Sequence, residues 1–150
     1  MSREDYERIC VELDGTRQQD HPRAYDILSL EEKNALQYWI EHAIQTAPKI
    51  DDQYSSYGLK REYERETKLY VSNAQFKGAM LVAGFQPVKK SEQSWHFMIQ
   101  PAYEERSALH QNQRIHEPTY RSVPQGKQDP QFDTLVQAAF ALRKANGVII

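Results

Sequence analysis

The sequence predicts an α+β fold that is mostly helical, and three observations lead to this prediction. Two short amphipathic helices follow each other between residues 55 and 83. The second of them opens with a Ser-x-x-Gln capping box, which marks a helix N-terminus. After it, Trp95, Phe97 and Ile99 recur at every second position, the period of a half-buried strand. Together these elements predict a winged helix-turn-helix core with extra N- and C-terminal helices.

The 150 residues divide into four predicted segments. The first helix is expected over residues 3–13, because apolar side chains recur there at helical spacing, and a loop should follow it. The segments are an acidic N-terminal helix and loop at 1–28, the winged-helix core at 29–100, a linker or arm at 101–130, and a C-terminal amphipathic helix at 131–150.

Three helices are predicted within the core segment. Ser29 opens a Ser-x-x-Glu capping box, so a helix should begin there. It should continue until Pro48, because the residue before a proline is pushed out of the helical region. The next helix is expected over residues 57–67 and the third over residues 73–83. Gly84 then suits the left-handed residue that often follows a helix C-terminus.

A two-stranded ribbon, or wing, is predicted after the third core helix, with strands at 86–90 and 94–99. Residues 101–130 contain several prolines and read as a linker or an extended arm. Asp129 at the N-cap and Pro130 at the first helical position then begin the last helix. Its apolar stripe is expected to fold back onto the same core or, alternatively, to dock on a partner.

Composition predicts a cytoplasmic protein. No apolar run approaches the roughly 20 residues of a membrane span, and the N-terminus lacks the apolar region of a signal peptide. Cys10 is the single cysteine, so no internal disulfide is expected.

The net charge of -2 is unevenly distributed along the chain. Residues 1–54 carry 6 basic and 12 acidic side chains, whereas residues 55–100 carry 7 basic and 4 acidic ones. The positive excess therefore falls on the predicted core, where phosphate contact would need it.

The predicted site is a surface that binds double-stranded DNA. The N-terminal residues of the 73–83 helix would reach base edges in the major groove, where Asn and Gln can read adenine. The capping box by itself also explains Gln75, whereas the sequence shows no structural role for Lys77. Lysines and an arginine on the first of these two helices and at the wing tip would contact phosphates. The predicted nucleic-acid-binding residues are Lys60, Arg61, Asn73, Gln75, Lys77, Lys89 and Lys90.

Patterns typical of catalysis are not found, so the chain is predicted not to be an enzyme. The sequence contains no glycine-rich phosphate loop, no Gly-x-Ser-x-Gly and no His-Glu-x-x-His. Its five histidines have no close spacing to cysteine or acidic residues that would suggest a metal site. No catalytic residue, metal ligand or cofactor is therefore expected.

The central block resembles a small domain of proteins from phages and mobile elements of Gram-positive bacteria. The resemblance rests on Ser-Tyr-Gly-Leu-Lys at 56–60, Tyr-Val-Ser-Asn-x-x-Phe-Lys-x-Ala-Met at 70–80, Gly-Phe at 84–85 and Trp-x-Phe at 95–97. It is also similar to the C-terminal winged helix of phage and poxvirus-type primase-helicases, and it covers roughly residues 30 to 99. The resemblance implies a winged-helix fold and a role in mobile-element biology. It implies no ATPase or primase activity, because the chain lacks those domains.

Two functions follow from this resemblance. The first is an accessory regulator that binds double-stranded DNA, for which a homodimer would be compatible. The alternative is a protein-binding inhibitor of a host defence nuclease, of the anti-CRISPR type, whose partner is a nucleic-acid-handling host protein. In that alternative the acidic N-terminal region would occupy a basic nucleic-acid channel. The contact surfaces assigned to it are this acidic region, with Glu4, Asp5, Glu7 and Glu12, and the C-terminal helix over residues 131–146.

Overall fold

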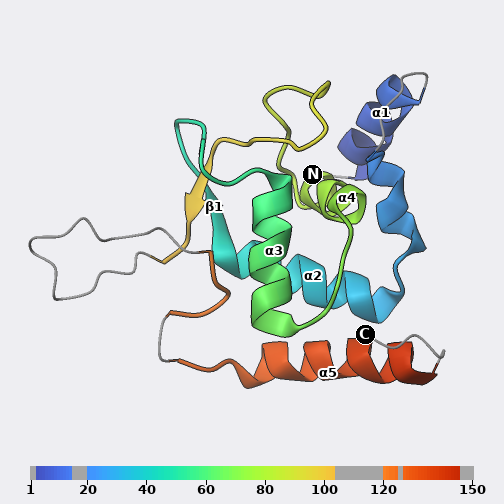
Figure 1. Cartoon of the computed structure of the whole chain (residues 1–150), viewed down its shortest axis with the longest axis vertical. Coiled ribbons are helices and arrows are strands. Elements are labelled where there is room, and N and C mark those ends of the chain that lie inside the picture. The colour runs from blue at the N-terminus through green and yellow to red at the C-terminus, as the bar shows by residue number, and fades with distance from the viewer. Residues whose placement is uncertain (1–2, 15–19, 104–119, 125–126, 146–150) are drawn as a thin grey trace, which may run out of the picture.

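The computed structural model describes residues 3–14, 20–103, 120–124 and 127–145. These residues are mostly helical, with one two-stranded antiparallel sheet (Figure 1). The elements in chain order are α1 (Arg3–Leu13), the 3-10 helix η1 (Pro22–Ile27), α2 (Leu30–Ala43), β1 (Ile44–Thr46), α3 (Ser56–Thr67), α4 (Asn73–Val82), β2 (Ile99–Pro101) and α5 (Pro130–Ala145).

The two capping boxes predicted from the sequence are both formed. Ser29 accepts a hydrogen bond from the N–H of Glu32 at 3.1 Å, and the Glu32 carboxylate accepts one from the N–H of Ser29 at 2.8 Å. Ser72 and Gln75 make the same reciprocal pair at 3.0 and 2.9 Å. Each pair satisfies two N–H groups that the helix cannot bond internally, which explains why α2 and α4 begin where they do.

The helix predicted to continue until Pro48 ends at Ala43 instead. Ile44 has an extended backbone (φ -123°, ψ 136°), and residues 44–46 form the strand β1. This strand pairs antiparallel with β2, so that Ile44 lies opposite Pro101 and Thr46 opposite Ile99. Apolar spacing could not distinguish the outcomes, because Ile44 is buried either way.

The predicted ribbon of strands 86–90 and 94–99 is also wrong, since the structure assigns no strand to residues 86–98. One backbone hydrogen bond joins the two halves, from Val88 N to His96 O at 3.0 Å. The carbonyl groups of Trp95 and Phe97 instead accept hydrogen bonds from Ser56 and Asp51, at 2.7 and 3.0 Å. Trp95, Phe97 and Ile99 are buried, as their alternation predicts. The backbone of this segment, however, bonds more to residues 51–56, which lead into α3, than to residues 86–90.

One hydrophobic cluster extends from Tyr6 in α1 to Ala139 in α5. Near its centre, Trp39 of α2 is completely buried and packs edge-on against Tyr63 and Phe76, with ring centroids 5.6 and 6.1 Å apart. Its indole N–H donates a hydrogen bond to Glu66 at 2.8 Å. Such a large buried aromatic side chain with a satisfied N–H ties α2, α3 and α4 into a single core.

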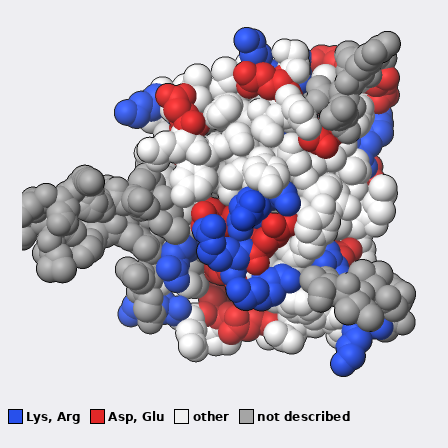
Figure 2. All heavy atoms as spheres, in the orientation of Figure 1, with Lys and Arg blue, Asp and Glu red and all other residues white. Residues whose placement is uncertain are grey.

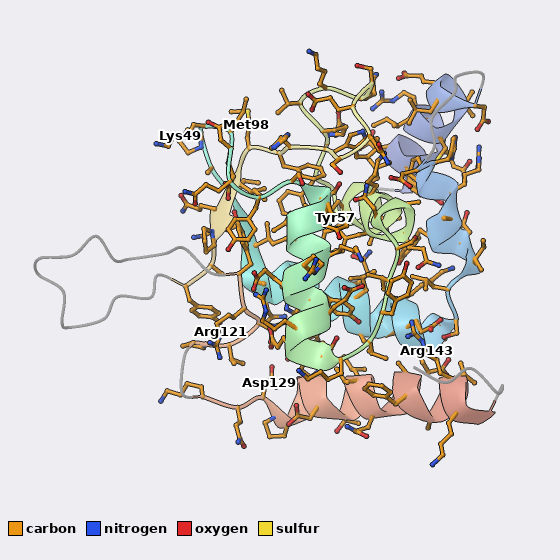
Figure 3. The ribbon with its side chains drawn as sticks, viewed as in Figure 1. Lys49, Tyr57, Met98, Arg121, Asp129 and Arg143 are labelled. Atoms are coloured by element: carbon orange, nitrogen blue, oxygen red, sulfur yellow. The ribbon has the colours of Figure 1, made fainter. Side chains whose placement is uncertain are left out.

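The C-terminal helix returns to this core rather than projecting from it, as Figure 1 shows along the length of α2. Asp129 and Arg143, near its two ends, both point toward the rest of the molecule (Figure 3). Asp129 caps the helix, accepting from the N–H of Gln131 at 3.1 Å, and it accepts the hydroxyl of Tyr38 at 2.7 Å. The last residues of the predicted 131–150 segment, 146–150, lie outside the described residues.

Part of the predicted linker 101–130 is packed against the core. Tyr120 is buried and its hydroxyl donates to Asp51 at 2.5 Å. Ser122 is also buried, and both its N–H and its hydroxyl donate to Glu66. Most of the remaining linker, residues 104–119 and 125–126, lies outside the described residues. The described part is therefore an anchored segment beside α3, not a free arm.

Candidate nucleic-acid interface

The helix predicted to read DNA, α4, is the most enclosed helix of the described chain. Eight of its ten residues are buried. The 3-10 helix η1 packs across it, and this is the most extensive contact between two described elements. Gly78 makes the approach close: a Cβ atom there would lie 2.3 Å from Pro22 O and 2.5 Å from Tyr25 Cβ. In this fold α4 has no open face that could enter a major groove.

Asn73, predicted to contact adenine, is buried and makes its hydrogen bonds within the protein. Its side chain is 9% exposed. Its carbonyl oxygen accepts the hydroxyl of Ser56 at 2.7 Å, and its amide donates to the carboxylate of Asp20 at 2.9 Å and to Gln93 O at 3.2 Å. Both ends of the amide therefore have protein partners. Asn73 joins α3, α4 and the N-terminal segment instead of presenting an edge to DNA.

Lys77 differs most from its prediction, because its side chain is completely buried. Its ammonium donates to Gln93 O at 2.9 Å and lies 4.4 Å from the ring centroid of Trp95. Burial lowers its pKa to about 8, and the charge of Asp20 opposes this shift. The structural role that the sequence did not reveal is to hold the 93–95 segment on α4. Gln75, in turn, is occupied by the capping box described above.

The predicted wing lysines are exposed, but Lys90 faces the N-terminal helix. Its ammonium lies 2.5 Å from the Glu12 carboxylate, and this hydrogen bond lowers the pKa of Glu12. Lys89 is exposed beside it. The acidic residues assigned to the inhibitor alternative are similarly placed among cations, with Glu7 3.2 Å from Arg23 and Asp5 3.1 Å from Arg8. Glu4 is exposed at the start of α1.

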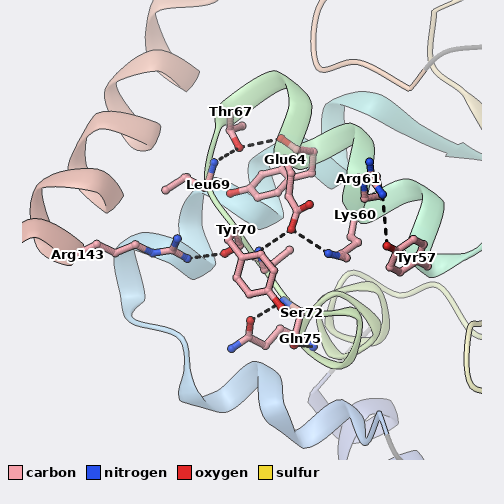
Figure 4. A network of polar contacts seen from close by, with 12 residues as sticks. Tyr57, Lys60, Arg61, Glu64, Thr67, Leu69, Tyr70, Ser72, Gln75 and Arg143 are labelled. Atoms are coloured by element: carbon pink, nitrogen blue, oxygen red, sulfur yellow. Dashed lines mark hydrogen bonds and ion pairs between the residues drawn. The ribbon is translucent and has the colours of Figure 1, made fainter. Parts of the chain in front are cut away.

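Lys60 and Arg61 lie on α3, and only Arg61 is exposed. Lys60 is 6% exposed, and its ammonium lies 3.0 Å from the Glu64 carboxylate. It also lies between two tyrosine rings, 5.1 Å from the centroid of Tyr57 and 4.9 Å from that of Tyr70. Arg61 donates to the Tyr57 hydroxyl at 3.3 Å, as Figure 4 shows. Lys60 is therefore a structural cation with two aromatic neighbours.

The structure adds four exposed residues that sequence reasoning did not assign to the site. Together with Arg61 they form what we call the α3 face, which comprises Tyr57, Arg61, Arg65, Lys68 and Tyr70. Tyr57, Arg61 and Arg65 repeat at spacings of four, which places them on one stripe of α3, and Lys68 follows directly after the helix. The sequence shows this spacing, but its capping box favours the following helix as the element that contacts DNA. The exposure of Tyr70, at 56%, depends on the loop after α3 and could not be read from periodicity.

The charges of the α3 face are arranged with cations outward. The Arg65 side chain is 64% exposed, whereas its partner Glu62, 2.6 Å away, is 11% exposed. The Glu64 side chain is 20% exposed and faces Lys60. Glu66 is also exposed, and its carboxylate accepts hydrogen bonds from Trp39 and Ser122. Figure 2 shows Lys and Arg atoms gathered over α3, with acidic atoms between and below them.

A polar pocket of about 330 Å³ lies beside the C-terminal end of α3. Its lining mixes acidic and basic side chains, among them Glu66, Arg121, Lys127 and Asp129. Figure 3 places Arg121 next to the C-terminal end of α3, so the pocket borders the α3 face.

Within the described residues, no group of three or more His, Cys, Asp or Glu side chains could hold a metal ion. None of the helices in that part of the chain has the length and apolar character to cross a membrane.

Comparison of the chain with protein-family models, curated proteins and solved structures finds no match to any of them.

Proposed function

We propose that this chain is a small, non-enzymatic winged-helix protein that binds nucleic acid through the α3 face, as an accessory regulator of a phage or mobile element. The order α2–β1–α3–α4–β2, with β1 antiparallel to β2, supports the winged-helix assignment. In that assignment α3 and α4 are the helix-turn-helix pair, and residues 86–98 take the place of the wing. The assignment to mobile elements rests on the sequence resemblance described above.

The observation that carries the proposal is the outward arrangement of cations on the α3 face. Arg61, Arg65 and Lys68 are exposed, while Glu62 and Glu64 between them are turned inward. A phosphate backbone approaching this face would meet guanidinium and ammonium groups first. Because exposed cations that replace condensed counterions supply most of the affinity for nucleic acid, this is the surface to which a strand would bind.

Two features favour this function over inhibition of a host nuclease by an acidic mimic. Three of the four carboxylates assigned to mimicry lie within 3.2 Å of a cation of the same chain: Asp5, Glu7 and Glu12. An acidic surface interleaved with arginine and lysine presents a weaker negative field to a basic channel. In addition, the apolar face of α5, the other contact surface of that alternative, is covered by α2.

The proposal can be tested by measuring binding of fluorescein-labelled oligonucleotides, single-stranded and duplex, by anisotropy between 50 and 300 mM salt. Replacing Arg61 and Lys68 together by glutamine should weaken binding and reduce the slope of log K against log salt. Each phosphate contact contributes roughly 0.7 to 0.9 to that slope, so two contacts should remove about 1.5.

A matched control removes the same charge elsewhere, by replacing the exposed Lys49 and Lys144 with glutamine. This variant should keep the slope of the parent protein. If the parent binds no oligonucleotide at 50 mM salt, nucleic-acid binding is refuted. If both double variants lose affinity equally, binding depends on overall charge and the α3 face is not the site.

A further inference from the structure

We propose that the α3 face takes single-stranded nucleic acid, with unpaired bases stacked on Tyr57 and Tyr70. This inference rests on the proposed function and names the class of ligand for the same face. Tyr57 is 47% exposed and Tyr70 is 56% exposed, the largest exposures among the tyrosines of the described chain. Arg61 and Lys68 flank them with positive charge.

The two rings are held in place by one internal ion pair. The Lys60 ammonium lies about equally close to both ring centroids, at 5.1 and 4.9 Å. Glu64 fixes this ammonium at 3.0 Å and also accepts the N–H of Val71 at 3.1 Å, which ties the loop that carries Tyr70 to α3. Figure 4 shows the Tyr70 and Tyr57 rings on opposite sides of Lys60. Ring positions fixed in the absence of a ligand reduce the ordering that stacking requires.

A ring surrounded by cations suits an unpaired base better than a duplex. In a duplex the faces of the bases are stacked on each other, and a protein reads base edges with an element placed in a groove. The helix that would fill this role, α4, is enclosed by η1. Single strands expose base faces, and surfaces that bind them combine aromatic platforms with a cationic path for the backbone. The α3 face has both parts.

The test compares a 15-nucleotide poly(dT) strand with a mixed-sequence 15-base-pair duplex, by fluorescence anisotropy at one moderate salt concentration. The parent protein should bind the single strand more tightly. Tyr57→Ala and Tyr70→Ala should each weaken that binding by roughly 5- to 150-fold, the range for loss of one stacked base. Binding to the duplex should change by less than about 2-fold, because there each ring has no unpaired base to contact.

Two sets of variants separate stacking from other losses. Tyr57→Phe and Tyr70→Phe keep the ring and should retain binding to the strand. Ile27→Ala and Val88→Ala remove exposed apolar side chains from η1 and from the 86–98 segment, and they should have no effect. Thermal unfolding by circular dichroism verifies that each alanine variant remains folded, which is expected because both rings are exposed.

The possible results separate a failure of single-strand binding from a failure of nucleic-acid binding as a whole. Binding to the duplex that equals or exceeds binding to the strand would overturn the single-strand assignment and leave nucleic-acid binding by the α3 face intact. Alanine variants that bind the strand like the parent would overturn the role of the rings. Binding to neither oligonucleotide would overturn the proposed function together with this inference.

Discussion

Replacing Gly78 by alanine tests the enclosure of α4 directly, because an open α4 and an enclosed α4 predict changes of opposite sign in the free energy of unfolding. Gly78 lies in the middle of α4. If this side of α4 were exposed to solvent, as DNA binding would require, alanine would stabilise the helix by about 1 kcal/mol through its higher helix propensity. In the structure, the added Cβ would lie 2.3 Å from the backbone oxygen of Pro22 and 2.5 Å from Tyr25 Cβ.

The expected loss of stability depends on which atoms would have to move to make room for the new Cβ. The nearest atom is a backbone carbonyl oxygen, which cannot rotate away as a side chain can. The η1 backbone would have to shift by roughly 1 Å to restore a normal contact. Overpacking of this kind costs about 1–3 kcal/mol, and a rigid neighbour favours the upper end. After subtracting the gain in helix propensity, we expect a net loss of about 2 kcal/mol, or a Tm lower by roughly 4–8 °C.

Urea unfolding followed by circular dichroism would measure this loss, with Gly58→Ala as the matched control. Gly58 also lies in a helix, α3, but a Cβ atom there would meet only Tyr54 Cδ1 at the ordinary distance of 3.4 Å. Gly58→Ala should therefore be neutral or up to about 1 kcal/mol more stable. A Gly78→Ala protein as stable as the parent would show that η1 does not press on α4 in solution, and the enclosure argument would fail.

Two further predictions concern buried cations. Lys77, with its pKa lowered to about 8, should make the free energy of unfolding rise between about pH 8 and 10.5, because over that range the unfolded chain binds a proton that the folded protein has released. Lys77→Met should remove this rise, so the parent-minus-variant difference in urea unfolding should grow from pH 7.5 to 9.5, and a difference that shrinks would contradict the assignment. Arg143 donates hydrogen bonds to the Glu32 carboxylate and, at 2.7 Å, to Tyr70 O, so Arg143→Met should cost roughly 3 kcal/mol of stability by leaving that largely buried carboxylate without its cation. The exposed neighbour Lys144→Met should change it by less than about 0.5 kcal/mol, and equal losses in the two variants would argue against the pair.

The local parts of the fold were predictable because their causes lie within a few residues. Ser29 and Ser72 with their partners three positions later mark helix starts through hydrogen bonds that span one turn. Asp129 followed by Pro130 does the same for α5. These signals require no knowledge of distant residues. The strand register was different, because it depends on residues far apart in the sequence: Thr46 and Ile99, which lie opposite each other, are separated by the whole of α3 and α4.

The positions of Asn73 and Lys77 could not be predicted for the same reason, because their contacts are made with residues far away in the sequence. Asn73 and Lys77 carry groups that bind DNA well, and nothing within several residues indicated other partners. Their partners come from elsewhere in the chain: Asp20 accepts from Asn73, and Gln93 O accepts from both residues. A polar side chain on a capped helix is compatible with a groove or with a buried network. Only the fold shows which of the two it has.

The small residues of α4 illustrate why this ambiguity matters for function. A helix surface with glycine and alanine allows close approach, and the partner can be DNA or another part of the chain. Here the partner is η1 with α1, which contribute Tyr6, Ile9 and Tyr25, each at most 3% exposed. Exposing three such side chains would cost roughly 5–9 kcal/mol, at about 1.5–3 kcal/mol each. A micromolar complex supplies only about 8 kcal/mol in total. DNA binding by an uncovered α4 would therefore consume most or all of its own binding energy, whereas binding at the proposed α3 face would require no such uncovering.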